Sequence, residues 1–168
     1  MIILSGPDLL RAEFDLLGFT FICIADPDRL VRAALRPPDS DCAMLRNIPE
    51  GMNYPLKSAE TFINNYLSGS DSAVPLPDLS SFLEKEQSVY AACITVGFGD
   101  RISYGSLARA AGLPGAARFA GSCMRKNIFP VFIPCHRVVP STGGIGFYSG
   151  GEDIKAKLLS FEESLRRR

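Results

Sequence analysis

Residues 103–124 read SYGSLARAAGLPGAARFAGSCM, and this stretch decides the fold of the second half of the chain. The pattern predicts a short helix over residues 103–111, a turn with two glycines and a proline over 112–115, and a second helix from 116 to about 124. A turn of this length joins two helices at a steep angle. The stretch is therefore typical of a helix-turn-helix, which occurs in DNA-binding proteins and also in many plain helical hairpins.

The second helix of this motif carries small residues where a major-groove reader would carry long polar ones. We predict that Ala117, Ala120 and Gly121 lie on its outer face, where small side chains let the backbone approach DNA closely. Close approach suits the narrow minor groove, which carries little sequence information. Arg118 is the one long polar side chain among them. We interpret it either as a plug for a vacated base site or as an ordinary surface arginine.

A second informative stretch follows at residues 128–139, IFPVFIPCHRVV. Its apolar, β-prone run ends at Pro134 and leads into Cys135, the only histidine of the chain (His136) and Arg137. A thiol beside an imidazole and a guanidinium can be held as a nucleophilic thiolate at neutral pH. The alternative is a buried structural cysteine, since free cysteine is often buried. The two polar neighbours favour the reactive cysteine, because burying both would require partners for both.

The cysteines and glycines exclude several other kinds of site. Five cysteines, widely spaced and without a Cys-x-x-Cys pair, argue against a disulfide framework, and one histidine supplies too few ligands for structural zinc. The glycine-dense stretch 141–151 matches neither a phosphate loop nor a dinucleotide fingerprint. We interpret it as a loop that walls a pocket, with Tyr148 and Ser149 as its contacts. No metal or cofactor is expected.

The charge distribution predicts two lobes. Residues 1–87 carry 7 Lys/Arg and 13 Asp/Glu, a net charge of −6, whereas residues 88–168 carry 11 and 5, a net charge of +6. Any polyanion should therefore contact the C-terminal lobe. Residues 68–80 are rich in Ser, Pro, Gly and Asp and are typical of a linker, which predicts domains at 1–79 and 80–168. No apolar run approaches about 18 residues, and the N-terminus lacks a secretory pattern, so we expect a cytosolic protein, or a nuclear one in a eukaryote, without membrane contact.

The remaining elements follow from periodicity and capping signals. In the first lobe we predict a strand over 18–25, a helix capped at 26–28 that continues to residue 35, a loop over 36–57, and a helix capped by Ser58 and ended by Gly69. In the second lobe, Ser80 or Ser81 with Glu84 predicts a capping box for a helix to about residue 95, with Cys93 in the core. A last helix over 152–165 carries Glu162, which could reach back to the histidine.

These residues together resemble the O6-alkylguanine-DNA alkyltransferase family. The segment PCHRV at 134–138 is similar to the family's active-site pentapeptide, and SYG at 103–105, AR at 117–118, Asn127 and YSGG at 148–151 fall in the family's order and spacing. The resemblance covers residues 80–165 closely and the first lobe loosely. The related alkyltransferase-like proteins usually have tryptophan in place of the cysteine, whereas this chain keeps Cys135 and contains no tryptophan.

The resemblance implies a fold and a role for each matched residue. It implies a small α/β, ribonuclease-H-like N-terminal lobe and a mostly α-helical, winged-helix-like C-terminal domain. Cys135 would accept the alkyl group, His136 would take its proton through a water, and Glu162 would orient His136. Asn127 would hold the turn after the recognition helix, and Tyr104 would press on the target phosphate and donate to the guanine ring. Arg118 would replace the extruded nucleotide and Arg125 would add a DNA contact. The guanine pocket would be lined by Met124, the Val138 backbone, Tyr148 and Ser149.

The implied function is DNA repair by direct, irreversible alkyl transfer. The methyl or larger group of O6-alkylguanine, with O4-alkylthymine as a further candidate substrate, would pass to the protein's own cysteine after minor-groove binding to double-stranded DNA and base flipping. Each monomer would act once, because a thioether has no good leaving group. A non-catalytic helix-turn-helix protein that binds alkylated bases or regulates transcription remains the alternative. A cysteine hydrolase is a weaker third, because catalytic Cys and His usually meet through the fold.

Overall fold

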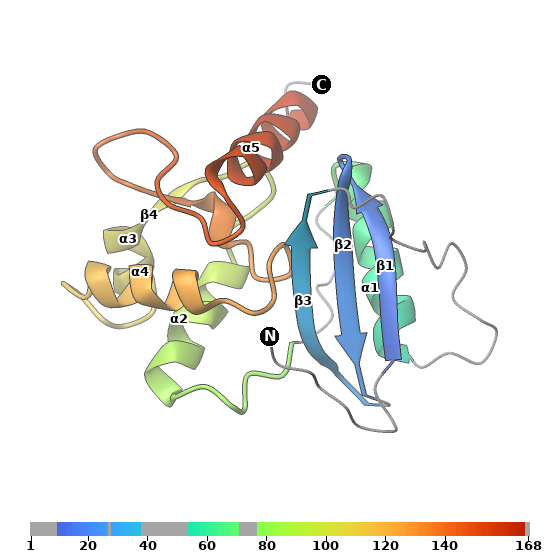
Figure 1. The fold of residues 1–168 in the computed structure, drawn as a ribbon. Helices are drawn as coiled ribbons and strands as arrows, with labels where there is room; N and C mark the ends of the chain where they lie inside the picture. Colours follow the sequence, from blue (N-terminus) through green and yellow to red (C-terminus); the bar gives the residue numbers. More distant parts are fainter. Residues whose placement is uncertain (1–9, 27, 38–53, 71–76, 167–168) are drawn as a thin grey trace. The chain divides into compact units, whose positions relative to one another are not determined.

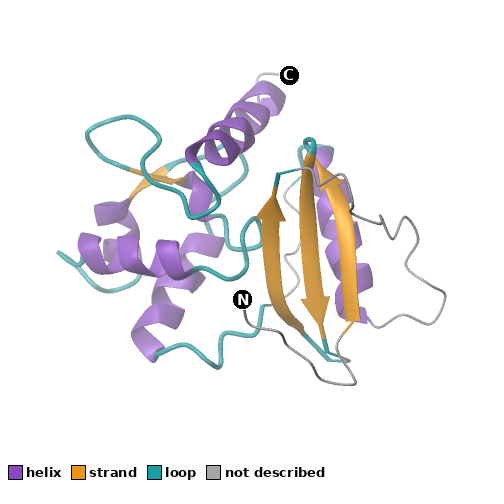
Figure 2. Cartoon of the chain, in the orientation of Figure 1, coloured by secondary structure: helices purple, strands orange, loops and turns teal. Residues whose placement is uncertain are grey.

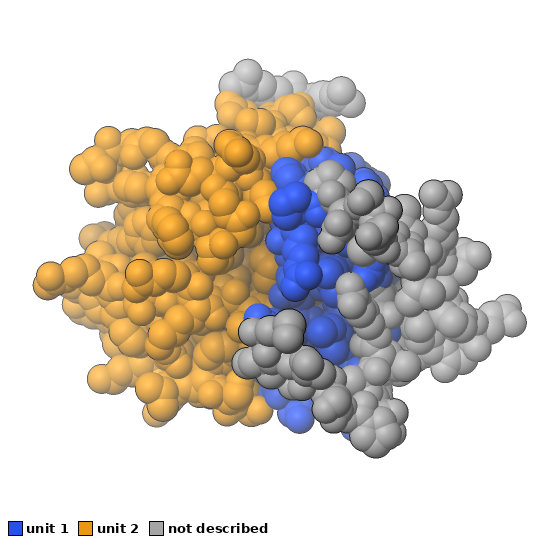
Figure 3. Space-filling model, in the orientation of Figure 1, with its two compact units in different colours: residues 1–78 blue, residues 79–168 orange. Residues whose placement is uncertain are grey.

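The computed structural model describes residues 10–26, 28–37, 54–70 and 77–166, and these form two compact units, Met1–Asp78 and Leu79–Arg168 (Figure 3). The first unit mixes strands with one helix, and the second is mostly helical (Figure 2). The predicted combination of an α/β lobe with a helical helix-turn-helix lobe is confirmed. Among the described residues, no helix is both long and apolar enough to cross a membrane.

The first unit contains an antiparallel sheet in the order β1 (Leu10–Leu16), β2 (Phe19–Ala25) and β3 (Leu30–Arg36). Leu17 and Gly18, both at positive φ, form the two-residue turn between β1 and β2, where Leu16 pairs with Phe19. Such a turn matches the twist of the strands it joins. Helix α1 (Tyr54–Leu67) packs along one face of the sheet (Figure 1). The strand predicted over 18–25 is confirmed, while β1 was not predicted.

The helix predicted over residues 30–35 is wrong, because this segment is strand β3. Asp26 does not cap a helix. Its Oδ1 accepts the backbone N–H groups of Asp28 and Arg29, both at 2.9 Å, and so closes a turn. Beyond the turn, β3 pairs with β2 in a register that sets Leu35 opposite Phe21. Hydrogen bonds to a neighbouring strand outweigh the local 3.6-residue spacing of the apolar side chains.

Helix α1 begins at Tyr54, four residues before the predicted cap at Ser58. Pro55 accounts for the difference, because proline is favoured in the first turn of a helix, where its missing N–H costs nothing. The helix ends at Leu67, just before the predicted stop at Gly69, which has φ +77° and whose N–H donates to the Tyr66 carbonyl at 3.0 Å. The rest of the predicted 36–57 loop (38–53) and residues 71–76 of the predicted linker lie outside the described residues.

The second unit is built around its helix-turn-helix. Helices α3 (Tyr104–Ala110) and α4 (Ala117–Lys126) form the predicted helix-turn-helix, and both also pack against α2 (Glu84–Ile94). The Ser103 side chain caps α3 by accepting the Ser106 N–H at 3.1 Å. Gly112 and Gly115 both have positive φ in the turn, which explains why glycine stands there. Cys93 is fully buried in this core, as predicted.

Two local predictions for this unit are wrong. Helix α2 is not capped by Ser80 or Ser81 with Glu84. It starts one residue after Leu83, whose N–H donates to the Glu86 side chain at 3.1 Å. The apolar run 128–134 is not a strand either, since it contains only an isolated bridge between Pro130 and Ile133 and a turn in which Val131 has φ +70°. Four of its apolar side chains, Phe129, Val131, Phe132 and Ile133, are buried around this turn, so burial rather than sheet pairing explains their hydrophobicity.

The chain after this turn forms the floor of the site. A one-turn 3-10 helix, η1 (Cys135–Arg137), leads into β5 (Val138–Val139), which pairs in parallel with β4 (Ile102–Ser103). A loop over 140–151 then reaches α5 (Glu152–Arg166), the predicted last helix, which packs against η1. The segment that carries Cys135 is therefore held between the helix-turn-helix on one side and α5 on the other.

Candidate active site

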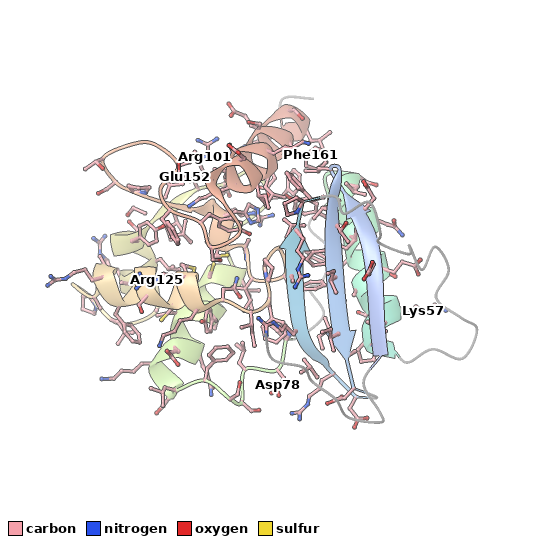
Figure 4. The ribbon with its side chains drawn as sticks, in the orientation of Figure 1. Lys57, Asp78, Arg101, Arg125, Glu152 and Phe161 are labelled. Carbon is pink, nitrogen blue, oxygen red and sulfur yellow. The ribbon has the colours of Figure 1, made fainter. Side chains whose placement is uncertain are left out.

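A pocket of about 420 Å³ opens in the second unit, within the size range of small-molecule sites (about 300–1,000 Å³). Its walls come from α3, α4, η1 and the loop before α5. The lining residues are Tyr104, Arg118, Gly121, Ser122, Met124, Arg125, Cys135, Phe147, Tyr148 and Ser149. Arg125 extends from α4 (Figure 4). A neighbouring hollow of about 400 Å³ shares Tyr104, Arg118 and Gly121 with the pocket and is also lined by Ala117.

The thiol of Cys135 is held by a network centred on Asn127. The Asn127 amide nitrogen lies 3.0 Å from both the Cys135 Sγ and the Ile133 carbonyl oxygen, and donates to each. Its amide oxygen accepts the Phe129 N–H at 2.9 Å. Because one side chain ties the turn after α4 to the sulfur, the thiol has a fixed position at the pocket wall, with only 4% of Cys135 exposed.

His136 lies next to a buried carboxylate that also holds Arg137. The His136 Nε2 is 2.8 Å from the Glu162 Oε1, and Arg137 donates from Nε and a terminal nitrogen to the same carboxylate at 3.0–3.1 Å. The Gly99 N–H donates to Glu162 as well, at 3.0 Å. Burial alone would raise the pKa of Glu162, but hydrogen bonds and charges from His136 and Arg137 lower it to about 2. Glu162 is therefore a carboxylate at neutral pH.

This arrangement keeps His136 neutral and fixes its tautomer. Burial lowers the pKa of His136, and the nearby cations Arg137 and Lys155 lower it further, against the opposing effect of Glu162. A neutral His136 must donate its Nε2–H to the Glu162 carboxylate, so Nδ1 carries the lone pair. Nδ1 is buried and has no hydrogen-bond partner among the described residues. His136 can therefore accept a proton at Nδ1.

The charge that favours a thiolate does not come from where the sequence predicted. Burial raises the pKa of Cys135, and the groups that oppose this effect are Asn127, Lys155 and the Tyr148 hydroxyl. His136 and Arg137, the sequence neighbours credited with activation, are instead engaged with Glu162. Arg137 also donates to the Val96 carbonyl. Both side chains are buried, because Glu162, which the sequence analysis placed near His136, is the partner of both.

Lys155 is a charged residue of the candidate site that the sequence analysis did not identify. Its side chain is fully buried, and its ammonium donates to the Val138 carbonyl oxygen at 2.7 Å. Burial lowers its pKa, while the Cys135 thiolate and Glu152 raise it. A signal was present, since Lys155 stands seven residues before Glu162 on the face of α5 that also carries Leu158 and Leu159. A lysine on a buried helix face requires an internal partner.

The structure brings most of the predicted residues together. Eight of them line the pocket: Tyr104, Arg118, Gly121, Met124, Arg125, Cys135, Tyr148 and Ser149. Ala120 does not fit its predicted place on a DNA-facing surface, because its side chain is fully buried. It shares the inner face of α4 with Cys123 and Met124, at helical spacing. Val138 is also fully buried, and its carbonyl is occupied by Lys155.

Comparison with known proteins gives a consistent picture. Residues 84–164 match the model of the family described as 6-O-methylguanine DNA methyltransferase, DNA binding domain. The methylated-DNA–protein-cysteine methyltransferase of Cricetulus griseus is 34% identical over 163 residues, which cover 92% of this chain and 76% of that protein. The Mus musculus protein of the same name is 39% identical over 122 residues, 68% of this chain and 58% of that protein.

Solved structures agree with the sequence relatives. The Mycobacterium tuberculosis OGT in complex with DNA has a TM-score of 0.73 at 26% identity, with 92% of this chain and 93% of that chain covered. The O6-methylguanine-DNA methyltransferase from Pyrococcus kodakaraensis has a TM-score of 0.66 at 25% identity, covering 92% and 98%. The segment that this chain shares with the Mus musculus protein covers 58% of that protein's length, which is less than two thirds.

The fold and the pocket define a class of two-unit proteins in which a buried cysteine lies directly behind a helix-turn-helix. Within that class, the chain belongs to the methylated-DNA–protein-cysteine methyltransferase family.

Proposed function

We propose that the protein repairs DNA by moving the alkyl group of O6-alkylguanine in double-stranded DNA onto Cys135, irreversibly and once per molecule. The observation that carries this proposal is the common pocket of the thiol, Arg118 and Arg125, which sets a nucleophile beside cations on the helix-turn-helix. Family relatives bear the name of this reaction, and a related structure is described as a complex with DNA. We further propose that the protein acts in the cytoplasm, or in the nucleus of a eukaryote, where its DNA substrate lies.

The chemistry requires an ionised sulfur, because an alkyl group on a guanine oxygen is a poor electrophile. The Cys135 proton would pass, through a water, to the Nδ1 of His136, whose orientation Glu162 fixes. The Sγ then attacks the alkyl carbon, an S–C bond forms, and the C–O6 bond breaks with its electron pair going to guanine. The guanine takes up a proton and the protein keeps a thioether. Nothing in the site reverses this bond, which supports a single turnover.

The target carbon lies inside a base stack, so the nucleotide must leave the duplex at a cost of a few kcal/mol. We propose that α4 enters the minor groove and that Arg118 occupies the position of the flipped nucleotide. Arg118 is exposed at the pocket rim, and Gly121, one turn later on α4, lies against the Tyr104 ring. Tyr148 and Ser149 would contact the flipped base from the opposite wall.

Intact-mass spectrometry after incubation with a duplex containing O6-methylguanine tests the reaction. We expect a stoichiometric gain of one methyl group on Cys135 and no gain for Cys135→Ala, which should still bind the duplex. Cys23→Ala, which removes a buried cysteine of the first unit, should accept the methyl group normally. Methyl transfer by Cys135→Ala, or none by the unchanged protein, would refute the proposal and favour a non-catalytic DNA-binding protein.

Arg118→Ala tests the flipping role separately. We expect it to slow transfer from duplex DNA by at least about tenfold while reducing affinity for undamaged DNA only slightly, since one phosphate contact is a small part of nonspecific binding. Transfer from a single-stranded oligonucleotide, which requires no flipping from a duplex, should change little. If affinity and duplex repair fall by the same factor, Arg118 is only a phosphate contact.

A further inference from the structure

Residues 96–101, in the connection from α2 to β4, contact the charged centre of the site, although the walls of the pocket come from other elements. The Gly99 N–H donates to the Glu162 carboxylate at 3.0 Å. The Val96 carbonyl accepts a hydrogen bond from a terminal nitrogen of Arg137. The backbone of this 96–101 loop therefore holds both members of the buried ion pair.

The 96–101 loop is also fixed against the last turn of α5. Arg166, one turn after Glu162 on this helix, donates to the Gly99 carbonyl at 3.0 Å and pairs with Asp100 at 2.8 Å. Gly99 has φ +75°, and a Cβ there would lie 3.1 Å from the Arg166 Cδ. Because the backbone passes so close to α5, the side chains of the loop have a defined place relative to Glu162.

The side chain that this loop brings to the ion pair is Phe98. The Arg137 Cζ lies over the Phe98 ring, 5.6 Å from its centroid, and the ring packs edge-on against Phe161 with centroids 6.4 Å apart. The N–H groups of Arg137 are directed to Glu162 and to a backbone carbonyl, while its face meets the ring. An aromatic face attracts a cation but has no lone pair that competes with a carboxylate. The half-buried ring therefore covers Arg137 without drawing it from Glu162.

The place of Arg137 matters because its charge acts on His136. Glu162 raises the pKa of His136, whereas Arg137 and Lys155 lower it. Burial raises the pKa values of the reacting thiol and of the Cys93 thiol on α2, so both are uncharged at rest. If Arg137 moved away from Glu162, the carboxylate would act on His136 with less opposition. His136 would then keep a proton at a higher pH, and a protonated His136 cannot accept the proton of the thiol.

We propose that Phe98 is a positioning residue: by covering the Arg137 guanidinium it keeps Arg137 on Glu162, and Glu162 then holds His136 with its Nε2–H donated and its Nδ1 available for the proton. This role rests on the proposed alkyl transfer and adds to it a residue from outside the pocket. Phe98 takes no part in bond making. Its effect reaches the thiol only through Arg137, Glu162 and His136.

The only histidine of the chain provides a direct test, because its ring signals in the nitrogen NMR spectrum of the tag-free, isotope-labelled protein belong to His136 alone. For the unchanged protein we expect a neutral ring at pH 7 with the proton on Nε2. Phe98→Leu keeps an apolar side chain but removes the ring. We expect it to raise the titration midpoint of His136 by at least about half a pH unit and to slow methyl transfer at pH 7 about threefold. The loss in rate should grow as the pH falls, because transfer requires a neutral His136.

Two variants serve as matched controls. Phe98→Tyr retains the aromatic face and should leave both the midpoint and the transfer rate close to those of the unchanged protein. Phe161→Leu removes the ring that packs against Phe98, and it should lower stability toward urea without moving the His136 midpoint. If circular dichroism shows that Phe98→Leu does not fold, Phe98→Met provides the same comparison with a more flexible apolar side chain.

Three outcomes would overturn the proposal while leaving the proposed function standing. A His136 midpoint and tautomer unchanged in Phe98→Leu would reduce Phe98 to ordinary packing, and so would an equal shift in Phe161→Leu. A shift in Phe98→Tyr as large as in Phe98→Leu would show that the aromatic face is not what holds Arg137. If the unchanged protein accepts no methyl group, the proposed function itself fails, while the NMR signals of His136 still show whether Phe98 positions it.

Discussion

Replacing Glu162 with glutamine should cost the protein about 3 kcal/mol of stability at neutral pH, because this carboxylate is the charge that Arg137 requires. Its pKa is lowered from 4.5 to about 2. That difference of 2.5, at about 1.36 kcal/mol per pH unit, corresponds to roughly 3.4 kcal/mol. Removing one partner of a buried ion pair leaves the other uncompensated and typically costs about 3–5 kcal/mol, which agrees. Both side chains are almost fully buried, so solvent screening reduces the value little.

The pH dependence gives the sharper test. A lowered carboxyl pKa contributes stability that is complete above the unfolded value of 4.5 and is lost as the pH falls toward 2. The difference in unfolding free energy between the unchanged protein and Glu162→Gln should therefore shrink from about 3 kcal/mol at pH 7 to roughly 1.4 kcal/mol at pH 3. Urea denaturation followed by circular dichroism measures it. Glu163→Gln is the matched control, since its half-exposed ion pair with Arg101 should contribute less than about 1 kcal/mol. A cost below 1 kcal/mol for Glu162→Gln, or a cost independent of pH, would refute the assignment.

Two further predictions concern the thiol and the loop. Lys155→Met should raise the pKa of the Cys135 thiol, because it removes a nearby positive charge. The pH midpoint of the thiol's reaction with iodoacetamide should therefore move up by at least about one pH unit. The control Lys157→Met, at an exposed lysine, should leave this midpoint unchanged. An unchanged midpoint would show that the ammonium does not act on the sulfur. Gly146→Ala should destabilise the protein more than Gly144→Ala, by at least about 1 kcal/mol. Both glycines have positive φ, but only at Gly146 would the new Cβ meet Pro140, at 2.8 Å, and equal costs would contradict this reasoning.

The helix-turn-helix was predictable because its signals are local. The Ser103 cap, the Gly112 and Gly115 turn and the small residues of α4 all act within a few positions along the chain. Strand β3 was missed for the opposite reason. Its apolar residues suit a helix locally, and only the hydrogen bonds to β2 decide for a strand. Local patterns therefore predicted the second unit better than the first.

The candidate site divides in the same way. Cys135 and His136 were identified because they are adjacent and polar in an apolar run, and Glu162 was placed near them from the last helix. The side chains of His136 and Arg137 are engaged with Glu162, so in the proposed mechanism His136 acts on the thiol as a proton acceptor and not as a neighbouring cation. Lys155, twenty residues after the cysteine, carries the charge that opposes burial of the thiolate. Spacing along α5 indicated a shared face but not which group that face would meet.

The charges of the site form two pairs supplied largely by one helix. Lys155 and Glu162 are seven residues apart on α5 and both face inward, so the docking of α5 against η1 brings both into place. Glu162 is balanced by Arg137, which leaves Lys155 as the cation beside a protonated Cys135. When the Cys135 thiol ionises, its negative charge balances the Lys155 ammonium. A permanently protonated His136 would instead add a second positive charge without a partner. Because burial raises the pKa of Cys135, the thiol is protonated at rest; when it ionises for transfer, Lys155 offsets the new charge, and the proton accepted by His136 passes on to solvent or substrate.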